Sequence, residues 1–167
     1  MATFNQQTGS NNPLNGINVG TYSTPTFADI DGDGDLDAIV GGGYGTVFYY
    51  KNTGSATNPV YTEQTGSNNP FDDIFVVIVS TPTLADLDGD GDLDAIVGGG
   101  YGTLLYYQNT GSATNPVYTL QTDTANPFNG ISVGNFSAPT FADLDGDGDL
   151  DAIVGAYDGT LRYYKNT

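Results

Sequence analysis

The string DGDGDLDAIVG occurs three times in this chain, beginning at Asp31, Asp88 and Asp145. Successive copies start 57 residues apart. A fixed period of this length is typical of repeat architectures, in which each unit buries its apolar face only against a neighbouring unit. The 167 residues therefore divide into three repeated units, and no linker of a separate composition interrupts them.

Each unit is rich in residues that favour strands. Runs of Val, Ile, Thr, Tyr and Phe are bounded by Gly, Pro, Asn and Asp, as in TPTFADI, LDAIVGG and TVFYYKNT. The 24 glycines and 8 prolines interrupt any helical period. The sequence therefore predicts an all-β fold with four antiparallel strands per unit. Because AIVG and VFYY are apolar at consecutive positions, both faces of each sheet should be covered.

Four-stranded sheets stacked around an axis form a β-propeller, and each sheet is one blade. We expect one repeat array over residues 1–167. Its parts are a closing strand and lead-in, 1–23, followed by blade repeats at 24–80, 81–137 and 138–167. Three blades are fewer than the roughly four to eight that propellers use, so a single chain is too short for a ring.

The two ends of the sequence complement each other. The segment TFNQQTG at residues 3–9 resembles YTEQTG and YTLQT after the first two repeats, whereas LRYYKNT in the third repeat is followed by no such segment. We expect residues 3–9 to supply the fourth strand of the repeat 138–167 in another chain, which would hide a free sheet edge. Two chains would then close a six-bladed homodimer. Three chains with nine blades, or an open three-blade arc, are the alternatives.

Each repeat carries an acidic loop, D-x-D-x-D-G-x-x-D, which runs from Asp29 to Asp37 in the first copy. It matches the first nine positions of an EF-hand loop, with side-chain oxygens at positions 1, 3, 5 and 9, glycine at 6 and a main-chain oxygen at 7. So many oxygens in one loop favour calcium over magnesium. Valine replaces the bidentate glutamate of position 12 (Val40, Val97 and Val154), which predicts a structural site with a Kd of about 10⁻⁴ to 10⁻⁵ M.

The predicted calcium ligands are the five aspartates of each loop, with about one ion per repeat and three per chain: Asp29, Asp31, Asp33, Asp35, Asp37, Asp86, Asp88, Asp90, Asp92, Asp94, Asp143, Asp145, Asp147, Asp149 and Asp151. The alternative is a solvated acidic turn without an ion. Crowded carboxylates repel one another unless a cation screens them, which favours the calcium interpretation.

Charge and residue usage exclude several functions. These loops hold fifteen of the twenty acidic residues, against three basic ones, and the net charge of −17 disfavours nucleic acid and anionic membranes as partners. With no histidine or cysteine and one glutamate, the chain lacks the usual catalytic bases and nucleophiles, so we expect no enzyme. No apolar stretch reaches the roughly 18 residues of a membrane span, and the first residues show no signal-peptide pattern.

Three tyrosines are candidates for ligand binding. Tyr44 and Tyr101 lie in the turn GGGYGT, and Tyr157 lies in the related turn GAYDGT. Their neighbours are small or polar, so exposed rings could stack on sugars as in a lectin. The alternative is that they cap the edges of blades.

The segment TPTFADIDGDGDLDAIVGGGYGTVFYYKNT and its two counterparts resemble the FG-GAP/VCBS group of propeller repeats, which includes the heads of integrin α-subunits. The resemblance implies calcium in the loop between the first two strands of each blade, and an extracellular or cell-surface parent protein. Members usually carry more blades per chain, and some relatives are lectins.

We therefore expect a calcium-stabilised propeller module with lectin-like carbohydrate binding at its blade junctions. The alternatives are a structural or adhesion repeat with a protein ligand, and a designed or reconstructed propeller fragment with no ligand.

Overall fold

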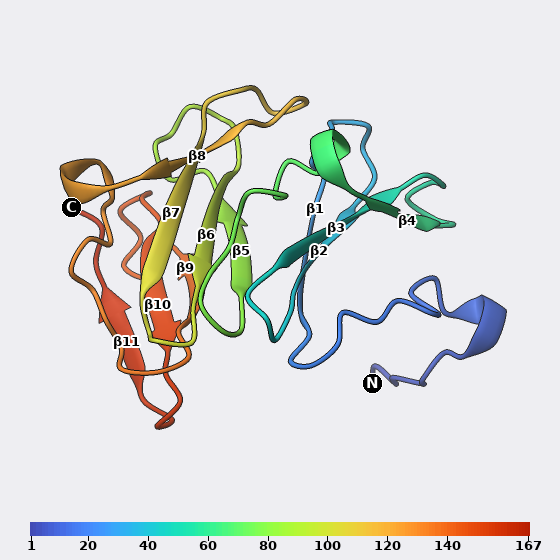
Figure 1. Cartoon of the computed structure of the whole chain (residues 1–167), viewed down its shortest axis with the longest axis horizontal. Coiled ribbons are helices and arrows are strands. Elements are labelled where there is room, and N and C mark those ends of the chain that lie inside the picture. Colours follow the sequence, from blue (N-terminus) through green and yellow to red (C-terminus); the bar gives the residue numbers. More distant parts are fainter.

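A computed structural model describes residues 1–167 as three antiparallel sheets that follow one another in chain order (Figure 1). We call these sheets blades 1, 2 and 3. Blade 1 contains β1 (Thr24–Ala28), β2 (Asp37–Gly41), β3 (Val47–Asn52) and β4 (Tyr61–Gln64). Blade 2 contains β5 (Thr81–Ala85), β6 (Asp94–Gly98), β7 (Leu104–Asn109) and β8 (Tyr118–Gln121). Blade 3 contains only β9 (Ala138–Ala142), β10 (Asp151–Gly155) and β11 (Leu161–Tyr164).

Within each blade the strands pair in sequence order as a meander. The register repeats with the sequence period: Tyr50 of β3 lies opposite Glu63, and Tyr107 of β7 lies opposite Leu120. The only helical elements are three short 3-10 turns, η1 (Gly9–Asn11), η2 (Gly66–Asn68) and η3 (Asp123–Ala125). The prediction of an all-β fold built from antiparallel sheets is confirmed. The structure contains no helix of the length and apolarity that crossing a membrane requires.

Each 3-10 turn begins a segment that runs to the next blade, and the second and third of these segments connect neighbouring blades. We name them lead-in 1 (residues 9–23), lead-in 2 (66–80) and lead-in 3 (123–137). At the junction of blades 1 and 2, the Ser80 hydroxyl donates to the Thr46 carbonyl at 2.6 Å and accepts from the Gly42 amide at 2.9 Å. The Thr24 hydroxyl donates to the Ser80 carbonyl at 2.6 Å. Lead-in 2 therefore fastens blade 2 to blade 1, and the same bonds from Ser137 of lead-in 3 fasten blade 3 to blade 2.

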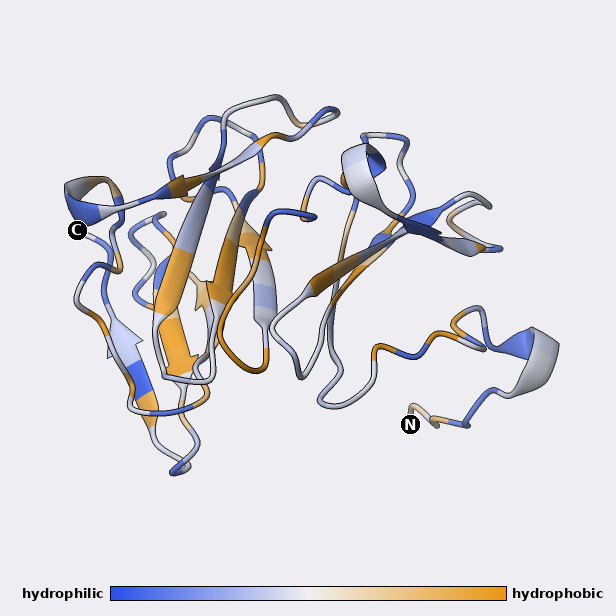
Figure 2. Ribbon diagram, viewed as in Figure 1, coloured by the Kyte–Doolittle hydropathy of each residue, from blue (hydrophilic) through white to orange (hydrophobic).

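The core lies between the blades. Figure 2 shows apolar residues gathered on the central strands and on the segment that leads into β5. One buried cluster joins Ile39 and Val47 of blade 1 to Phe71 of lead-in 2 and Val97 of blade 2. A second joins blade 2 to blade 3 in the same way. Both faces of blade 2 are thus covered, which explains why β6 is apolar at consecutive positions. In blade 1, β2 is covered by blade 2 on one face and by lead-in 1 on the other.

The chain itself forms an open array. The N-terminal segment and the C-terminus lie at opposite ends of it (Figure 1). Residues 3–9 pair with no strand, and β11 has a partner on one side only. The architecture is that of a propeller-like fragment, in which lead-in 1 alone covers the inner face of blade 1 and no blade covers the outer face of blade 3.

Candidate metal centre

The acidic loops join the first two strands of each blade. In blade 1 the Asp29 carboxylate accepts the amides of Gly32 at 2.7 Å and Gly34 at 2.9 Å, which folds the loop around this side chain. Both glycines have a positive φ, and Thr114 of blade 2 leaves no space for a side chain at Gly32. The same pair of amide contacts recurs at Asp86 and Asp143. The DGDG spacing therefore dictates the turn that gathers the carboxylates.

Three carboxylates meet in each loop, with ligand oxygens that all lie within 4.8 Å of one another. We call these groups the aspartate triads: Asp29, Asp31 and Asp33; Asp86, Asp88 and Asp90; Asp143, Asp145 and Asp147. The sequence predicted all nine residues as ligands, and the structure brings them together in sets of three.

The other two predicted ligands of each loop lie outside the triads. The Asp35 amide donates to the Asp33 carboxylate at 3.0 Å, and the Asp35 side chain is not part of the group. Asp92 and Asp149, which correspond to Asp35, also lie outside the triads, as do Asp37 and the corresponding Asp94 and Asp151. The structure thus separates the proposed ligands into three clustered and two unclustered aspartates per repeat.

Asp37 is buried, and internal donors occupy both of its oxygens. Oδ1 accepts the Asn52 amide at 2.6 Å, and Oδ2 accepts the Tyr49 hydroxyl at 2.8 Å and the Ile30 amide at 3.3 Å. These bonds join the acidic loop, β2 and β3. Asp94 makes the same contacts in blade 2, as does Asp151 in blade 3.

Burial raises the pKa of the Asp37 and Asp94 carboxyls, and the hydrogen bonds that they accept oppose this only in part. Burial acts in the same direction at Asp151, but there the bonds from Asn166 and Tyr163 outweigh it, and the pKa is lowered. The difference follows the packing, because another blade covers the corresponding region of blades 1 and 2 but not of blade 3.

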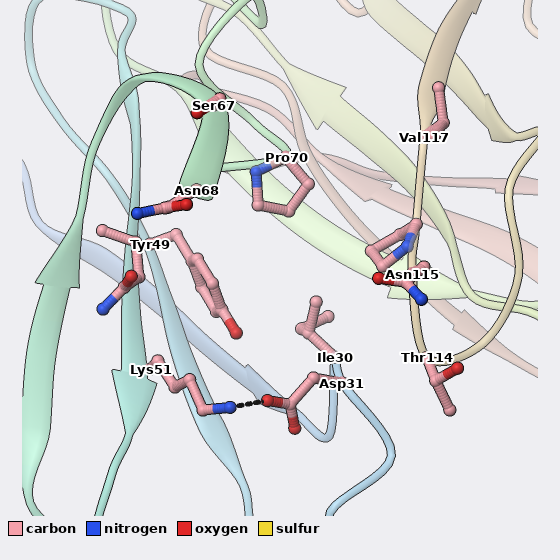
Figure 3. Close-up of a pocket in the computed structure, with 12 residues that line it drawn as sticks. Ile30, Asp31, Tyr49, Lys51, Ser67, Asn68, Pro70, Thr114, Asn115 and Val117 are labelled. Atoms are coloured by element: carbon pink, nitrogen blue, oxygen red, sulfur yellow. Dashed lines mark hydrogen bonds and ion pairs between the residues drawn. The ribbon is translucent and has the colours of Figure 1, made fainter.

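A lysine shares the triad in two of the three blades. The Lys51 ammonium contacts Asp31 Oδ2 and lies 3.8 Å from Asp33 Oδ2. Figure 3 shows Lys51 on β3 pointing toward Asp31 across the mouth of a cleft. In blade 3, Lys165 contacts Asp145 and lies 3.2 Å from Asp147. Blade 2 has the neutral Gln108 instead, which donates to Asp88 Oδ2 at 2.6 Å.

These three residues were not among the predicted site residues. They stand at successive positions of the 57-residue period, directly before an asparagine, and two of them are among the only three basic residues of the chain. The recurrence of these rare basic side chains at a fixed distance from the acidic loops was the sequence pattern that could have predicted their contact with the triads. The Lys51 hydrogen bond raises the pKa of its own ammonium. Burial raises the pKa of Asp31, but the bond from Lys51 and its charge outweigh that effect, so the Asp31 pKa is lowered.

The residues of the triads fit a calcium ion. All of the donors are carboxylate oxygens, which a hard cation prefers. Asp31 Oδ1 is buried and has no hydrogen-bond partner, so one acceptor remains free for a cation. In blades 1 and 3 an ammonium already lies against the triad, which indicates that the cluster attracts positive charge.

The predicted ligand-binding tyrosines lie elsewhere. Tyr44, Tyr101 and Tyr157 are exposed on the turns β2–β3, β6–β7 and β10–β11, at the opposite end of each second strand from the acidic loop. The Tyr157 ring packs against Phe136, with centroids 5.5 Å apart. None of the three lines the cleft of about 540 Å³ in Figure 3, which is formed by residues of blades 1 and 2 beside Asp31.

Comparison with known proteins agrees with this geometry. The family model described as FG-GAP-like repeat matches residues 29–97 and again residues 86–154. Each match runs from one acidic loop through the next, and together they span most of the chain. No curated protein and no solved structure matched the sequence. The two overlapping matches and the repeated acidic hairpins establish that the chain belongs to the FG-GAP-like repeat family.

Proposed function

We propose that this chain is a calcium-stabilised structural or adhesion module of an extracellular or cell-surface protein, and that it binds ligands without converting them. The observation that carries the proposal is the aspartate triad, which recurs in all three blades and leaves Asp31 Oδ1 buried without a partner. FG-GAP-like repeats of this kind are typical of extracellular proteins, in which millimolar calcium can fill sites of modest affinity.

Asp29, Asp31 and Asp33 would hold the ion in blade 1, and the corresponding triads would do so in the other blades. Calcium supplies positive charge that cancels the mutual repulsion of the carboxylates. Because Asp29 directly follows β1 and Asp37 begins β2, a filled loop fixes the hairpin between the two inner strands. We propose that Asp35 and its counterparts contribute through their main-chain oxygens, and that Asp37 and its counterparts contribute through the hydrogen bonds that their carboxylates accept.

Thermal unfolding in millimolar calcium and in excess chelator tests the proposal. Ions that bind only the folded state stabilise it by about 1.4 kcal/mol per site at ten times the Kd. We expect the melting temperature to fall clearly in chelator and to recover on addition of calcium but not of equal magnesium. The variant Asp33→Asn should lose part of this difference, whereas Asp72→Asn, outside the loops, should keep it. An identical melting curve in calcium and chelator would contradict the proposal.

We further propose that two copies close a six-bladed ring, each giving residues 3–9 to blade 3 of the other. The free edge of β11 and the unpaired N-terminal segment support this arrangement. Six lies within the range of about four to eight blades that propellers use. The protein partner in this proposal is a second copy of the same chain.

Carbohydrate binding is the second candidate function. It is favoured by the repeated placement of exposed Tyr44, Tyr101 and Tyr157 on uncharged or weakly charged turns, where an aromatic face could stack on a sugar ring. A glycan array probed in calcium should then show binding that a Tyr44→Ala, Tyr101→Ala double variant loses. Absence of binding to every glycan at millimolar sugar would remove this candidate and leave the structural or adhesion role.

A further inference from the structure

Two interblade junctions are complete within the chain, and they are built alike. At the first, Val47 and Tyr49 of blade 1 are buried beneath Phe71 of lead-in 2 and Val97 of blade 2. At the second, Leu104 and Tyr106 of blade 2 are buried beneath the corresponding residues of lead-in 3 and blade 3. These junctions define what the outer face of any blade in this array contacts.

The outer face of blade 3 presents the same side chains without a cover. Leu161 stands at the position of Val47 and Leu104, yet it is 77% exposed. Tyr163 stands at the position of the buried Tyr49 and is 49% exposed. Blade 3 therefore carries an apolar face that its counterparts bury.

A matching apolar face lies at the other end of the array. Lead-in 1 and the inner face of blade 1 form a small cluster of Val19, Ala38, Val40 and Tyr50, with Ile17 against it. At the first junction the corresponding cluster of lead-in 2 and blade 2, which is Val76, Ala95, Val97 and Tyr107 with Ile74, joins the outer face of blade 1. The first blade thus holds one half of a junction, and the third blade holds the other half.

The glycines of the outer faces provide a second, independent observation. A Cβ on Gly41 would lie 2.0 Å from the Ser80 carbonyl oxygen, and one on Gly98 would lie 2.2 Å from the Ser137 carbonyl oxygen. Glycine is required there because the next lead-in passes against the strand. Gly155 is the third member of this series, but a Cβ on it would meet nothing closer than 3.8 Å. Blade 3 therefore keeps the clearance for a following lead-in that the chain does not place there.

An open apolar cavity of about 230 Å³ lies at the free edge of blade 3, beside Phe128 and Phe141. At the first junction the residue corresponding to Phe128 is Phe71, and Tyr118 of β8 stacks on it with centroids 4.8 Å apart. Within blade 1 the residue corresponding to Phe141 is Phe27, and the ring of Tyr61 on β4 packs edge-on against it, with centroids 6.2 Å apart.

Tyr61 and Tyr118 are successive members of the 57-residue series, and Phe4 is the member that precedes them. Phe4 is 97% exposed in the chain. The two neighbouring blades therefore identify the same aromatic position as the occupant of the cavity, and the chain supplies an unburied Phe at that position.

We infer that blade 3 of one copy and lead-in 1 with blade 1 of a second copy form a third junction, in which Phe4 of the second copy fills the cavity beside Phe128 and Phe141. This inference rests on the proposed two-copy ring and specifies its contacts. The second copy is the occupant because the N-terminal segment and blade 3 of one chain lie at opposite ends of the array (Figure 1). This third junction lacks one hydrogen bond of the other two, since Ala138 stands where Thr24 and Thr81 donate a hydroxyl.

The strand register follows from the two complete blades. Tyr50 pairs with Glu63 and Tyr107 pairs with Leu120. Tyr164 of β11 therefore pairs with Gln6 of the second copy. Asn52 pairs with Tyr61 in blade 1, so Asn166 lies opposite Phe4 of the second copy. This pairing places the Phe4 ring over the cavity.

Light scattering after size exclusion in millimolar calcium tests the junction. The wild-type chain should show twice its 17.4 kDa mass. Phe4→Tyr, which restores the residue of the other blades, should keep that mass. Phe4→Ser and Gly155→Ala should each give a mass near that of one chain. The alanine is sterically free within a single chain, so unchanged circular dichroism of Gly155→Ala would show that its effect lies in the junction.

Cross-linking tests the register. The chain has no cysteine, so the double variant Gln6→Cys, Tyr164→Cys introduces one candidate pair, at the Cα separation of about 4.5–5.5 Å that suits a disulfide. Oxidation should give a covalent dimer. The control Gln7→Cys, Tyr164→Cys shifts the first cysteine to the opposite face of the strand and should give little.

A wild-type mass of one or three chains, or a two-chain mass that Phe4→Ser and Gly155→Ala both leave unchanged, would overturn the inference. Calcium stabilisation is read separately on the same samples. A single-chain mass with a melting temperature that still depends on calcium would reject the junction and leave the calcium module standing. A two-chain mass with a melting temperature that does not depend on calcium would support the junction and reject the calcium module.

Discussion

The Asp37 carboxylate accepts three hydrogen bonds from β3 and the acidic loop, whereas the Asp33 carboxylate, four residues earlier, faces two other carboxylates. Within the nine residues of the acidic loop, aspartate therefore serves both as a buried hydrogen-bond acceptor and as a member of the carboxylate cluster. The triads were predictable because the DGDG spacing fixes both the turn and its acids. The position of Asp37 was not, since its donors Tyr49 and Asn52 come from a different strand and become neighbours only through tertiary packing.

The different roles of these aspartates predict different effects on stability in the absence of calcium. Asp37→Asn replaces an acceptor oxygen with an amide donor that faces other donors, so we expect a loss of about 2–4 kcal/mol in the free energy of unfolding. Asp33→Asn removes repulsion from the triad and should be neutral or slightly stabilising. Urea unfolding in chelator measures both. Equal losses for the two variants would contradict the separation of structural and clustered aspartates.

Lys51 predicts unequal calcium affinities among the three loops. Its ammonium lies against the triad of blade 1. A calcium ion that binds there must either displace this ammonium or be repelled by it. Gln108, at the same position in blade 2, is neutral. We expect Lys51→Gln to increase the calcium affinity of the first loop about fivefold, because one positive charge near a divalent ion is removed. Titration calorimetry measures the change.

Two variants serve as controls for the lysine prediction. Lys51→Arg keeps the charge and should leave the affinity close to that of the wild type. Gln108→Lys should weaken the second loop. If all three proteins bound calcium with the same affinities, the charge at this position would have no influence on the site.

The lead-in segments are the elements that the sequence described least well. The strands of each blade were predictable from runs of β-branched and aromatic residues, and their all-β character is confirmed. The 3-10 turns, and the way in which each lead-in spans two blades, depend on contacts between residues of successive repeats. Ser80 illustrates this, because its partners Gly42 and Thr46 lie 38 and 34 residues earlier. No local pattern reveals such partners.

Ser80→Ala should weaken the junction of blades 1 and 2. The substitution removes the bond from the Ser80 hydroxyl to the Thr46 carbonyl and the buried bond that this hydroxyl accepts from the Gly42 amide, so we expect a loss of about 1–3 kcal/mol in unfolding free energy. Ser23→Ala is the matched control, because Ser23 holds the same position in lead-in 1. In the monomeric background of Gly155→Ala, the Ser23 substitution should change denaturant midpoints little. An equally small effect of Ser80→Ala would show that the hydroxyl is dispensable.

The whole molecule carries a net charge of −17, most of it on the acidic loops. Corresponding loops of successive blades lie at the same end of their sheets, so their charges reinforce one another across the array. Three divalent ions would reduce the net charge to −11. This collective repulsion is a property of composition and could be read from the sequence. Closure of the array was also predicted from the sequence, on the complementary ends of the chain, and it stays a prediction.

Repulsion of this kind predicts a dependence of stability on salt. In chelator, raising sodium chloride from about 10 to 500 mM should increase the melting temperature, because the Debye length falls from about 30 Å to a few ångströms. In millimolar calcium the same change in salt should have a smaller effect, since bound ions already offset part of the charge. Differential scanning fluorimetry provides both series. A melting temperature that salt does not raise in chelator would show that repulsion is unimportant.

Lead-in 2 and lead-in 3 each begin at the end of one blade and pack against the next, so the 57-residue unit of sequence does not coincide with one folded blade. A duplicated stretch of 57 residues, inserted in phase, would bring one new blade and one new junction with contacts already present in its neighbours. Such an array could lengthen or shorten through recombination without any adjustment of its existing side chains. Glycine at the positions of Gly41 and Gly45 would then be among the features that every copy must inherit to accept a successor, because a Cβ at either would meet the next lead-in.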